Sequence, residues 1–449
     1  MPTRTSTLAR KAAFALTASL SLALFATACT GQASSGAEDD PSKETTLTFW
    51  HAWSAPGEVK AVKDLVAGFE KTHPTIHVNV VGNMTDDKIN QALRAGGSKA
   101  PDVISSFTTN NVGKFCSSGA LIDLNPFFKK SGVDPETTFP KAMNEYTQFD
   151  GDRCAVPLLG DAYGLYYNKT AFEKAGVTAP PKTWSEFEAV AKKLTIADGD
   201  SYKQLGFMPN YHGWETTTEH YLGQFSPTYF GEDGKSTLAT DPAVQAGFTL
   251  QKKLVDSLGG FQKLEKYRAG LGDEWGPKHP FHTGQVAMQL DGEWRLGMAL
   301  EAKPDFEIGV APLPVPDDQA DQYGKGYITG TIAGIAATSK KQNAAWELVK
   351  YMTTDTDAVV GFSNAIHNVP STLAALKSPK LKYDPRFKTF LDIAADPNST
   401  TSPASVNGGV YLTTIQQLGY DYESGRLKDL KAGLKKAAGQ IDTDIAQAK

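Results

Sequence analysis

The strongest constraint on this fold is a hydrophobic pattern that switches repeatedly between the strand period and the helix period. Residues 46–49 alternate as a short strand, residues 58–73 carry apolar side chains at helical spacing until Pro74, and residues 76–81 alternate again. A helical pattern over 88–94 and a strand pattern over 102–105 follow. This β-α-β-α-β order predicts a parallel sheet with right-handed crossovers.

The same alternation restarts after Asp161. It predicts strands at 163–167 and 205–208, with a helix at 184–194 that Thr183 caps. Later patterns predict strands at 286–290, 306–311 and 328–337, a helix at 343–353 and a mostly helical tail over 411–449. Trp184 and Trp346 fall inside helical periods, so we assign both to the core. The 449 residues accommodate two or three domains at ~150 residues each, and we expect α/β units in tandem.

The N-terminus has the layout of a secretory signal. Residues 1–28 contain Arg4, Arg10 and Lys11, no acidic residue, and then a stretch rich in Ser, Ala and Leu. A retained membrane anchor is the alternative. The small residues 26–28 before Cys29 resemble the lipobox of bacterial lipoproteins, which implies removal of 1–28 and a lipid on Cys29. The protein would then be anchored at the extracytoplasmic face of the cell membrane, and the polar residues 29–45 would form a flexible linker.

Two further cysteines remain once Cys29 carries a lipid. In an exported chain, the pair Cys116 and Cys154 predicts a disulfide. Two buried thiols that pack as small apolar groups are the alternative if the chain is not exported.

Composition and motifs exclude several function classes. The formal net charge of −5 provides no basic excess for nucleic acid. The sequence contains no phosphate-binding loop, HExxH, GxSxG or EF-hand motif, so it predicts no cofactor and no metal site. His279 and His282 lie in unperiodic, Pro-rich sequence, which favours a solvated loop over a metal site. Asp291 and Glu293 are the acidic doublet that a glycoside hydrolase could use, although acidic doublets are usually solvated.

Aromatic residues near the predicted strand ends suggest a different function. An aromatic face beside Asp, Asn or His suits a pyranose ring, whose C–H face stacks on the π surface while its hydroxyls form hydrogen bonds. Core packing is the alternative for each aromatic residue alone, because Trp and Tyr are usually largely buried. The residues in question are Trp50, His51, Trp53, Tyr163, Tyr166, Tyr167, Tyr211, Trp214, Trp275, Trp294 and Tyr411.

Five blocks, in order, resemble the extracellular solute-binding proteins of bacterial ABC importers, in the branch similar to maltose-binding protein. The most specific block is VPLLGDAYGLYYNKTAF at 156–172 with PPKTWSEF at 180–187. The others are TLTFWHAW at 46–53, APDVISS at 100–106, GQVAMQLDGEW at 284–294 and GTIAGIAATSKKQNAAWELVKYM at 330–352.

The resemblance implies a two-lobe α/β fold of the type II periplasmic-binding-protein kind, in which each lobe is a sheet flanked by helices. The ligand would lie between the lobes, which a hinge joins. Matching the blocks assigns 46–160 plus 292–325 to lobe one, and 161–291 plus 326–449 with the C-terminal helices to lobe two. The implied function is capture of a mono- or oligosaccharide by a monomer, hinge closure, and delivery to a permease in the membrane, without catalysis.

The resemblance also implies which residues bind the ligand. Trp294 is the expected sugar platform, and Asp161 is expected to accept hydrogen bonds from sugar hydroxyls. The full set is Trp50, His51, Trp53, Ser106, Thr109, Asp161, Tyr163, Tyr211, Trp214, Trp275, Asp291, Trp294, Gly330, Thr331 and Tyr411.

Three alternatives stay open at this point. The family also takes up glycerophosphodiesters and other polar solutes, and Arg153 and Arg295 are the candidate cations for such a ligand. A secreted glycoside hydrolase would use Asp291 and Glu293. A surface adhesion protein would bind its ligand without lobe closure. The residues 105–107, Ser-Ser-Phe, stand where sugar binders of the family often have Trp, so the stacking residue of lobe one is open.

Overall fold

The computed structural model describes residues 39–97, 100–209 and 215–449. The predicted signal 1–28, Cys29 and the linker as far as residue 38 lie outside the described residues, as do Tyr211 and Trp214. Among the described helices, none is both long enough and apolar enough to cross a membrane. The last residues of the predicted linker are held in place, because the Asp39 carboxylate accepts the N–H groups of Asn343 and Ala344 at 2.8 and 3.0 Å.

Ten strands form one sheet in the part of the chain that the structure describes, in the order β2-β1-β3-β9-β4-β7-β6-β5, with β10 and β8 also paired to β4. Strands β1, β2 and β3 pair in parallel, as the β-α-β-α-β pattern predicts. The strands are β1 (Thr45–Trp50), β2 (Ile76–Val81), β3 (Val103–Ser106), β4 (Val156–Asn168), β5 (Ile196–Asp198), β6 (Ser201–Phe207), β7 (Val286–Gly292), β8 (Ile308–Ala311), β9 (Ile328–Ile335) and β10 (Val369–Pro370).

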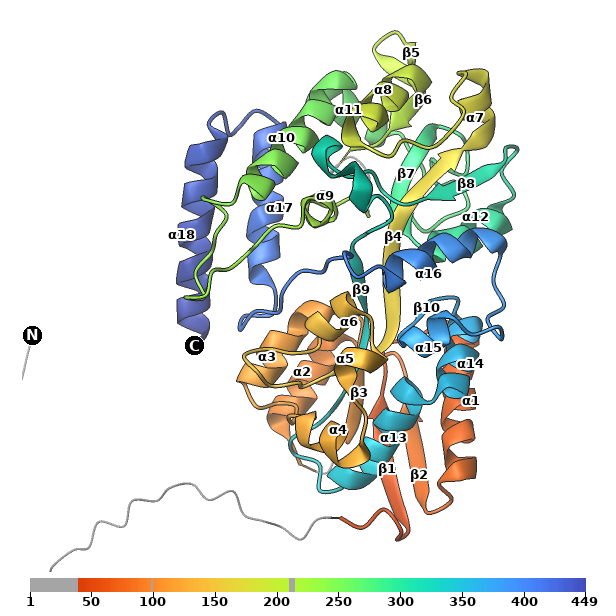
Figure 1. Ribbon diagram of the computed structural model, residues 1–449, viewed down its shortest axis with the longest axis vertical. Helices are drawn as coiled ribbons and strands as arrows, with labels where there is room; N and C mark the ends of the chain where they lie inside the picture. Colours follow the sequence, from red (N-terminus) through yellow and green to blue (C-terminus); the bar gives the residue numbers. More distant parts are fainter. Residues whose placement is uncertain (1–38, 98–99, 210–214) are drawn as a thin grey trace, which may run out of the picture. The chain divides into compact units, whose positions relative to one another are not determined.

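Strand β4 is shared by two groups of strands, which we call the first and second half-sheets (Figure 1). As far as Ala162, β4 pairs with β9, and β9 in turn pairs with β3. From Tyr163 onward, β4 pairs with β7 on one edge and with β8 on the other. The first half-sheet is therefore β2, β1, β3, β9, β10 and the start of β4, and the second is the end of β4 with β5, β6, β7 and β8.

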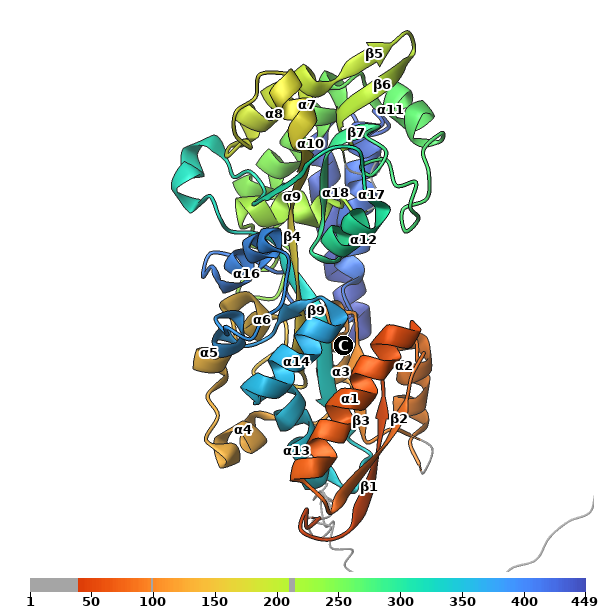
Figure 2. The ribbon, with the colours of Figure 1, turned by 90° about the vertical axis from the view of Figure 1, so that its right-hand side faces the viewer.

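Helices cover both half-sheets (Figures 1 and 2). Helices α1, α13 and α14 pack together on the first half-sheet, and α9, α10, α17 and α18 pack together beside the second. The helices are α1 (Pro56–Thr72), α2 (Asp86–Ala95), α3 (Val112–Ser117), α4 (Asn125–Ser131), α5 (Pro135–Thr138), α6 (Lys141–Glu145), α7 (Lys169–Lys174), α8 (Trp184–Leu194), α9 (Thr218–Phe225), α10 (Pro242–Ser257), α11 (Phe261–Arg268), α12 (Trp294–Ala302), α13 (Gln342–Thr354), α14 (Thr356–Ile366), α15 (Leu373–Leu376), α16 (Lys388–Ala395), α17 (Val410–Glu423) and α18 (Leu430–Ala448). Short 3-10 turns are η1 (Thr109–Asn111), η2 (Asp317–Gln322) and η3 (Pro385–Phe387).

Local signals in the sequence account for several of these elements. Helix α8 begins at a capping box, in which the Thr183 side chain and the N3 residue Glu186 satisfy each other's backbone N–H groups. Trp184 and Trp346 are buried in apolar clusters, as predicted. The predicted disulfide between Cys116 and Cys154 is present.

Strand pairing differs from the expected lobe boundaries in two segments. Residues 292–325 were expected in lobe one, but β8 pairs with Leu165–Asn168 of β4 in the second half-sheet. Residues 326–449 were expected in lobe two, but β9 pairs with β3, and α13 and α14 pack on α1. The reason is that the chain stays with the second half-sheet through β7 and β8 and first returns at β9. Later segments return to the second half-sheet: η3 and α16 pack against β8 and β4, α17 packs with α9 and α10, and α18 packs on α17.

Candidate functional site

The predicted platform Trp294 lies where β7 ends and α12 begins, beside the point at which β4 changes partners. Its side chain is partly exposed, and its ring covers Gly292, where an added Cβ would come within 2.3 Å of the indole. Tyr163 meets the indole edge-on, with ring centroids 5.6 Å apart. The indole N–H has no hydrogen-bond partner among the described residues. Trp294 therefore offers a partly exposed aromatic face on which a sugar ring can stack, while its unpaired N–H is buried.

Asp161 lies in β4 one residue before the partner change, and it forms a cluster with two residues that the sequence did not single out together. The side-chain amide of Asn368 donates to Asp161 Oδ1 at 2.7 Å and to Glu293 Oε1 at 2.8 Å. The N–H of Ala162 donates to Glu293 Oε2 at 2.9 Å. Burial raises the pKa of Asp161 to about 6, and burial together with the charge of Asp161 raises the pKa of Glu293 well above its usual range. Both effects favour the protonated form of Glu293.

A second cluster of acidic residues lies around Arg295, which directly follows Trp294 in the sequence. The Arg295 guanidinium is fully buried, and its Nε donates to Asp291 Oδ2 at 2.7 Å while Nη1 donates to the carbonyl of Glu274 at 3.0 Å. Burial, followed by the charges of Asp291 and Glu274, raises the pKa of Glu215 to about 8. The predicted residue Asp291 thus holds Arg295, and with 1% exposure it has no free face for a ligand.

Among the predicted aromatics that the structure describes, Trp275 is the most exposed, with 57% of its surface accessible. The Arg295 guanidinium lies over its ring at 5.4 Å from the centroid. This contact fixes one face of the indole. The other face is open to solvent, so Trp275 can contact a ligand only from outside the acidic group.

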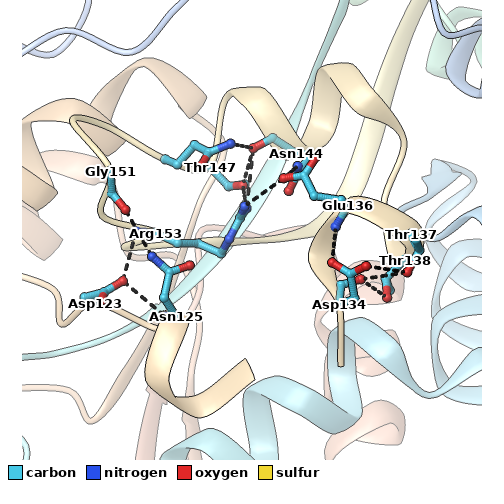
Figure 3. Close-up of polar contacts among 11 residues, drawn as sticks. Asp123, Asn125, Asp134, Glu136, Thr137, Thr138, Asn144, Thr147, Gly151 and Arg153 are labelled. Carbon is cyan, nitrogen blue, oxygen red and sulfur yellow. Dashed lines mark hydrogen bonds and ion pairs between the residues drawn. The ribbon is translucent and has the colours of Figure 1, made fainter. Parts of the chain in front are cut away.

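Arg153, the other cation considered for an anionic ligand, is taken up by the protein itself (Figure 3). It is 3% exposed, and its Nη1 donates to Thr147 Oγ1 at 2.8 Å and to the carbonyl of Asn144 at 3.4 Å. Its Nη2 lies 3.8 Å from Glu136 Oε1. Arg153 therefore fastens the segment before β4 to α5 and α6, and it is not available to bind an anion.

The predicted loop after β1 is mostly buried. Trp53 is 4% exposed and meets Phe107 and Phe362 edge-on, at 5.2 and 5.3 Å. His51 is fully buried, and its burial lowers its pKa to about 4, so it is neutral. Trp50 is half-buried. Phe107, which follows β3, is 47% exposed and is the accessible aromatic of this group. It stands where the family often has Trp, so the sequence carried a signal for it.

Two predicted residues, at the end of β3 and just after it, contact other parts of the protein and are shielded from solvent. The Ser106 hydroxyl donates to Asp86 Oδ1 at 2.7 Å at the start of α2, and the N–H of Thr108 donates to Ser106 at 3.1 Å. Thr109 begins η1 and is 4% exposed. Both residues shape the turn that presents Phe107.

Three further predictions fall in the protein interior. Gly330 pairs with Gly160 in the sheet, where an added Cβ would meet the carbonyl oxygen of Leu159 at 2.3 Å, so it is required by backbone packing. Thr331 is 4% exposed in the same strand. Tyr411 is 1% exposed, its hydroxyl donates to the carbonyl of Pro403 at 2.8 Å, and its ring packs in the core of the C-terminal helices. Burial removes these three residues from a ligand surface in this conformation.

Helix α9 contributes two residues that sequence reasoning missed. The His220 ring lies 3.9 Å from the Tyr163 ring, and burial lowers its pKa to about 3. Burial raises the pKa of Glu219 to about 7, and its Oε2 has no partner among the described residues. No motif marks either residue, because they reach Tyr163 only through the folding of α9 beside β4. They extend the polar surroundings of Trp294.

A cavity of about 950 Å³ lies away from these residues and contains none of the predicted ligand-binding residues. Basic side chains from α2 and α3, Arg94 and Lys114, line one side, and residues 404–407 with the end of α18 line the other. We keep the candidate site at Trp294, because its partly exposed indole lies at the junction of β7 and α12, directly after Glu293 of the carboxyl cluster. In the described ranges no group of three His, Cys, Asp or Glu side chains is placed to hold a metal ion.

In comparison with known proteins, residues 53–359 match the family described as bacterial extracellular solute-binding protein. The maltotriose-binding protein of Pyrococcus abyssi is 23% identical over 342 residues, which cover 76% of this chain and 69% of that protein. The sn-glycerol-3-phosphate-binding periplasmic protein of Brucella abortus is 25% identical over 423 residues, covering 90% and 94%. The solved structure of the sugar-binding protein MalE from Xanthomonas citri matches with a TM-score of 0.75 at 23% identity, covering 90% of this chain and 98% of that chain.

Proposed function

Since the chain belongs to the bacterial extracellular solute-binding protein family, we propose that it captures a neutral carbohydrate and delivers it to the permease of an ABC importer. The observation that carries this proposal is the partly exposed indole of Trp294, which directly follows Glu293, the residue that shares the Asn368 amide with Asp161. A sugar face stacks on the indole, and its hydroxyls donate to the carboxylate.

Electrostatics favours a neutral sugar over a glycerophosphate, although a relative that binds sn-glycerol 3-phosphate covers more of the chain. Phosphate recognition relies on Arg, Lys or free backbone N–H groups. Arg295 is bound to Asp291 and Arg153 to Thr147. A phosphate dianion at Trp294 would therefore find the neighbouring Arg295 guanidinium already engaged.

The same geometry argues against a glycoside hydrolase. Retaining and inverting hydrolases hold two carboxyl groups about 5 Å or more apart on either side of the scissile bond. Asp291 and Glu293 are each 1% exposed and are engaged by Arg295 and by the Ala162 N–H, respectively. We therefore propose binding without turnover. We also propose that a lipid on Cys29 anchors a monomer at the extracytoplasmic face of the membrane, and that the ligand is bound by closure of the half-sheets around β4.

The test measures unfolding temperature and binding heat with maltotriose, mannotriose and sn-glycerol 3-phosphate. A sugar at a hundredfold excess over its Kd raises the stability of the folded state by about 2.7 kcal/mol. For the sugar that binds, Trp294→Ala is expected to raise the Kd about tenfold or more. Trp275→Ala is the matched control and should change the Kd less. Tighter binding of glycerol phosphate than of either sugar, or full affinity in Trp294→Ala, contradicts the proposal. Release of shorter sugars over time contradicts binding without turnover.

A further inference from the structure

Three chain segments meet at the cluster formed by Asp161, Glu293 and Asn368. Asp161 belongs to β4 at its change of partners, Glu293 joins β7 to α12, and Asn368 directly precedes β10. The Asn368 amide bridges the two carboxyl groups, and Glu293 also holds the β4 backbone through the Ala162 N–H. The cluster therefore ties together the segments at which the two half-sheets join.

The same Asn368 nitrogen lies 2.7 Å from Asp161 Oδ1 and 2.8 Å from Glu293 Oε1, so the two carboxyl groups lie side by side, where they can share a hydrogen bond. Two ionised carboxylates cannot do so, because neither has a proton to donate. A buried carboxyl pair without a cation keeps one proton, and its two titration steps belong to the pair. Of the two groups, Glu293 is the more deeply buried, with 1% exposure, whereas Asp161 is partly exposed.

Among the described residues, no cation acts on this carboxyl pair in place of the proton. The phenols of Tyr146, Tyr163, Tyr166 and Tyr383 face the two carboxyl groups from α6, β4 and the segment after α15. The charged pair Asp291 and Arg295 also lies near, but the guanidinium Nε is bound to Asp291 Oδ2 at 2.7 Å. These groups supply no positive charge to Asp161 or Glu293.

Asp161 accepts hydrogen bonds from the Asn368 amide and from the Thr329 hydroxyl as well as from Glu293. A carboxylate has about four lone-pair positions. Three protein donors leave about one position for a ligand, and they fix the direction in which it points. The ordering of Asp161 thus depends on a proton held by its neighbour.

We propose that Glu293 is a positioning residue that keeps one proton and donates a hydrogen bond through it to Asp161, so that Asp161 remains an ionised acceptor aimed at one hydroxyl of the ligand. The proposal rests on the proposed function and names a determinant of its specificity. In acid the pair carries two protons and Asp161 loses its charge. In alkali the pair carries none, and the two buried charges repel. Affinity is therefore highest in the window between the two steps.

The first measurement needs no ligand. Infrared spectra of the full chain, recorded at neutral pH for wild type and Glu293→Gln, give a difference spectrum in which a protonated carboxylic acid band belongs to Glu293. The pair proton predicts this band, and its loss at alkaline pH. Absence of the band overturns the proposal, whatever the protein binds. Glu215→Gln provides the control for other protonated acids, since its difference band must be separate from that of Glu293.

The second measurement follows the Kd of the sugar found above from pH 5 to pH 9. Wild-type affinity is expected to fall about tenfold or more toward pH 5 and toward pH 9, which is the loss expected when a charge-assisted hydrogen bond is removed. Glu293→Gln keeps a donor without a titrating proton, so its affinity stays level on the alkaline side and still falls in acid. A wild-type profile that is level on the alkaline side, or a variant with the wild-type profile, overturns the proposal. If no sugar binds, the proposed function fails and the infrared result still decides where the proton is.

If Glu293→Gln does not fold, Asp161→Asn provides the second variant. Removing the charge of Asp161 lowers the pKa of Glu293 toward its usual range, so the infrared band of Glu293 titrates at a lower pH than in wild type. A band that titrates at the same pH in both proteins overturns the coupling between the two groups.

Discussion

Removal of the disulfide provides a quantitative test of the fold around the site. Cys116 lies in α3 and Cys154 lies two residues before the start of β4, at a sequence separation of 38. Closing a loop of that length removes ~13 cal/mol/K from the entropy of the unfolded chain, which corresponds to about 3.9 kcal/mol at 25 °C. The Cys116→Ala/Cys154→Ala variant should therefore unfold with a free energy about 4 kcal/mol lower than wild type.

The assay is urea unfolding, followed by fluorescence, of the oxidised wild type, the reduced wild type and the double variant. The reduced wild type and the double variant should agree within about 1 kcal/mol, because both lose the same constraint on the unfolded chain. Ser117→Ala, an exposed neighbour in α3, is the control and should unfold as wild type does. A double variant within about 1 kcal/mol of the oxidised wild type would refute the loop-entropy argument.

Three other changes follow from the contacts described. Gly330→Ala should destabilise the protein by about 1–3 kcal/mol or more in urea unfolding, because its Cβ would meet the Leu159 carbonyl oxygen; an unchanged midpoint contradicts this packing. Glu219→Gln should be as stable as wild type below about pH 4.5 and more stable than wild type above pH 7. The reason is that the folded-state pKa of Glu219 is raised to about 7, so the wild-type protein loses stability as the pH rises through that value. Equal unfolding curves at pH 8 contradict the burial argument. Phe107→Ala should weaken sugar binding severalfold while changing stability by less than about 1 kcal/mol, because the ring is 47% exposed, and full affinity excludes it as the second stacking residue.

Local patterns in the sequence predicted the elements well, because periodicity and caps act over a few residues. The predicted strand 76–81 coincides with β2, and Thr183 caps α8 as expected. Pairing between distant strands is not encoded locally. The pairing of β9 with β3 and of β8 with the end of β4 depends on which strand edges remain free once β4 has passed from the first half-sheet to the second. The expected lobe boundaries therefore differed from the strand pairing.

The site shows the same division between local and distant signals. Trp294 could be chosen from the sequence, because it follows a strand in a block shared with a known family. Tyr411 could not be told from it, because burial depends on how α17 packs against distant residues. Asn368 reaches Asp161 from 207 positions away in the sequence, so no spacing rule identifies it. The carboxyl pair likewise forms only when β4 and the β7–α12 junction come together.

The buried acids around Trp294 explain why a neutral, hydroxyl-rich ligand suits this site. Burial raises the pKa of Glu215 to about 8 and that of Glu219 to about 7, so these two groups are partly or largely protonated near neutral pH, and burial shifts the pKa of Glu293 in the same direction. A protonated carboxyl group donates one hydrogen bond and accepts others, as a hydroxyl group does. Such a site can pair with hydroxyls in both directions without a net charge to neutralise. A phosphate would instead require a free cation, and Arg295, the guanidinium beside the platform, is already bound to Asp291.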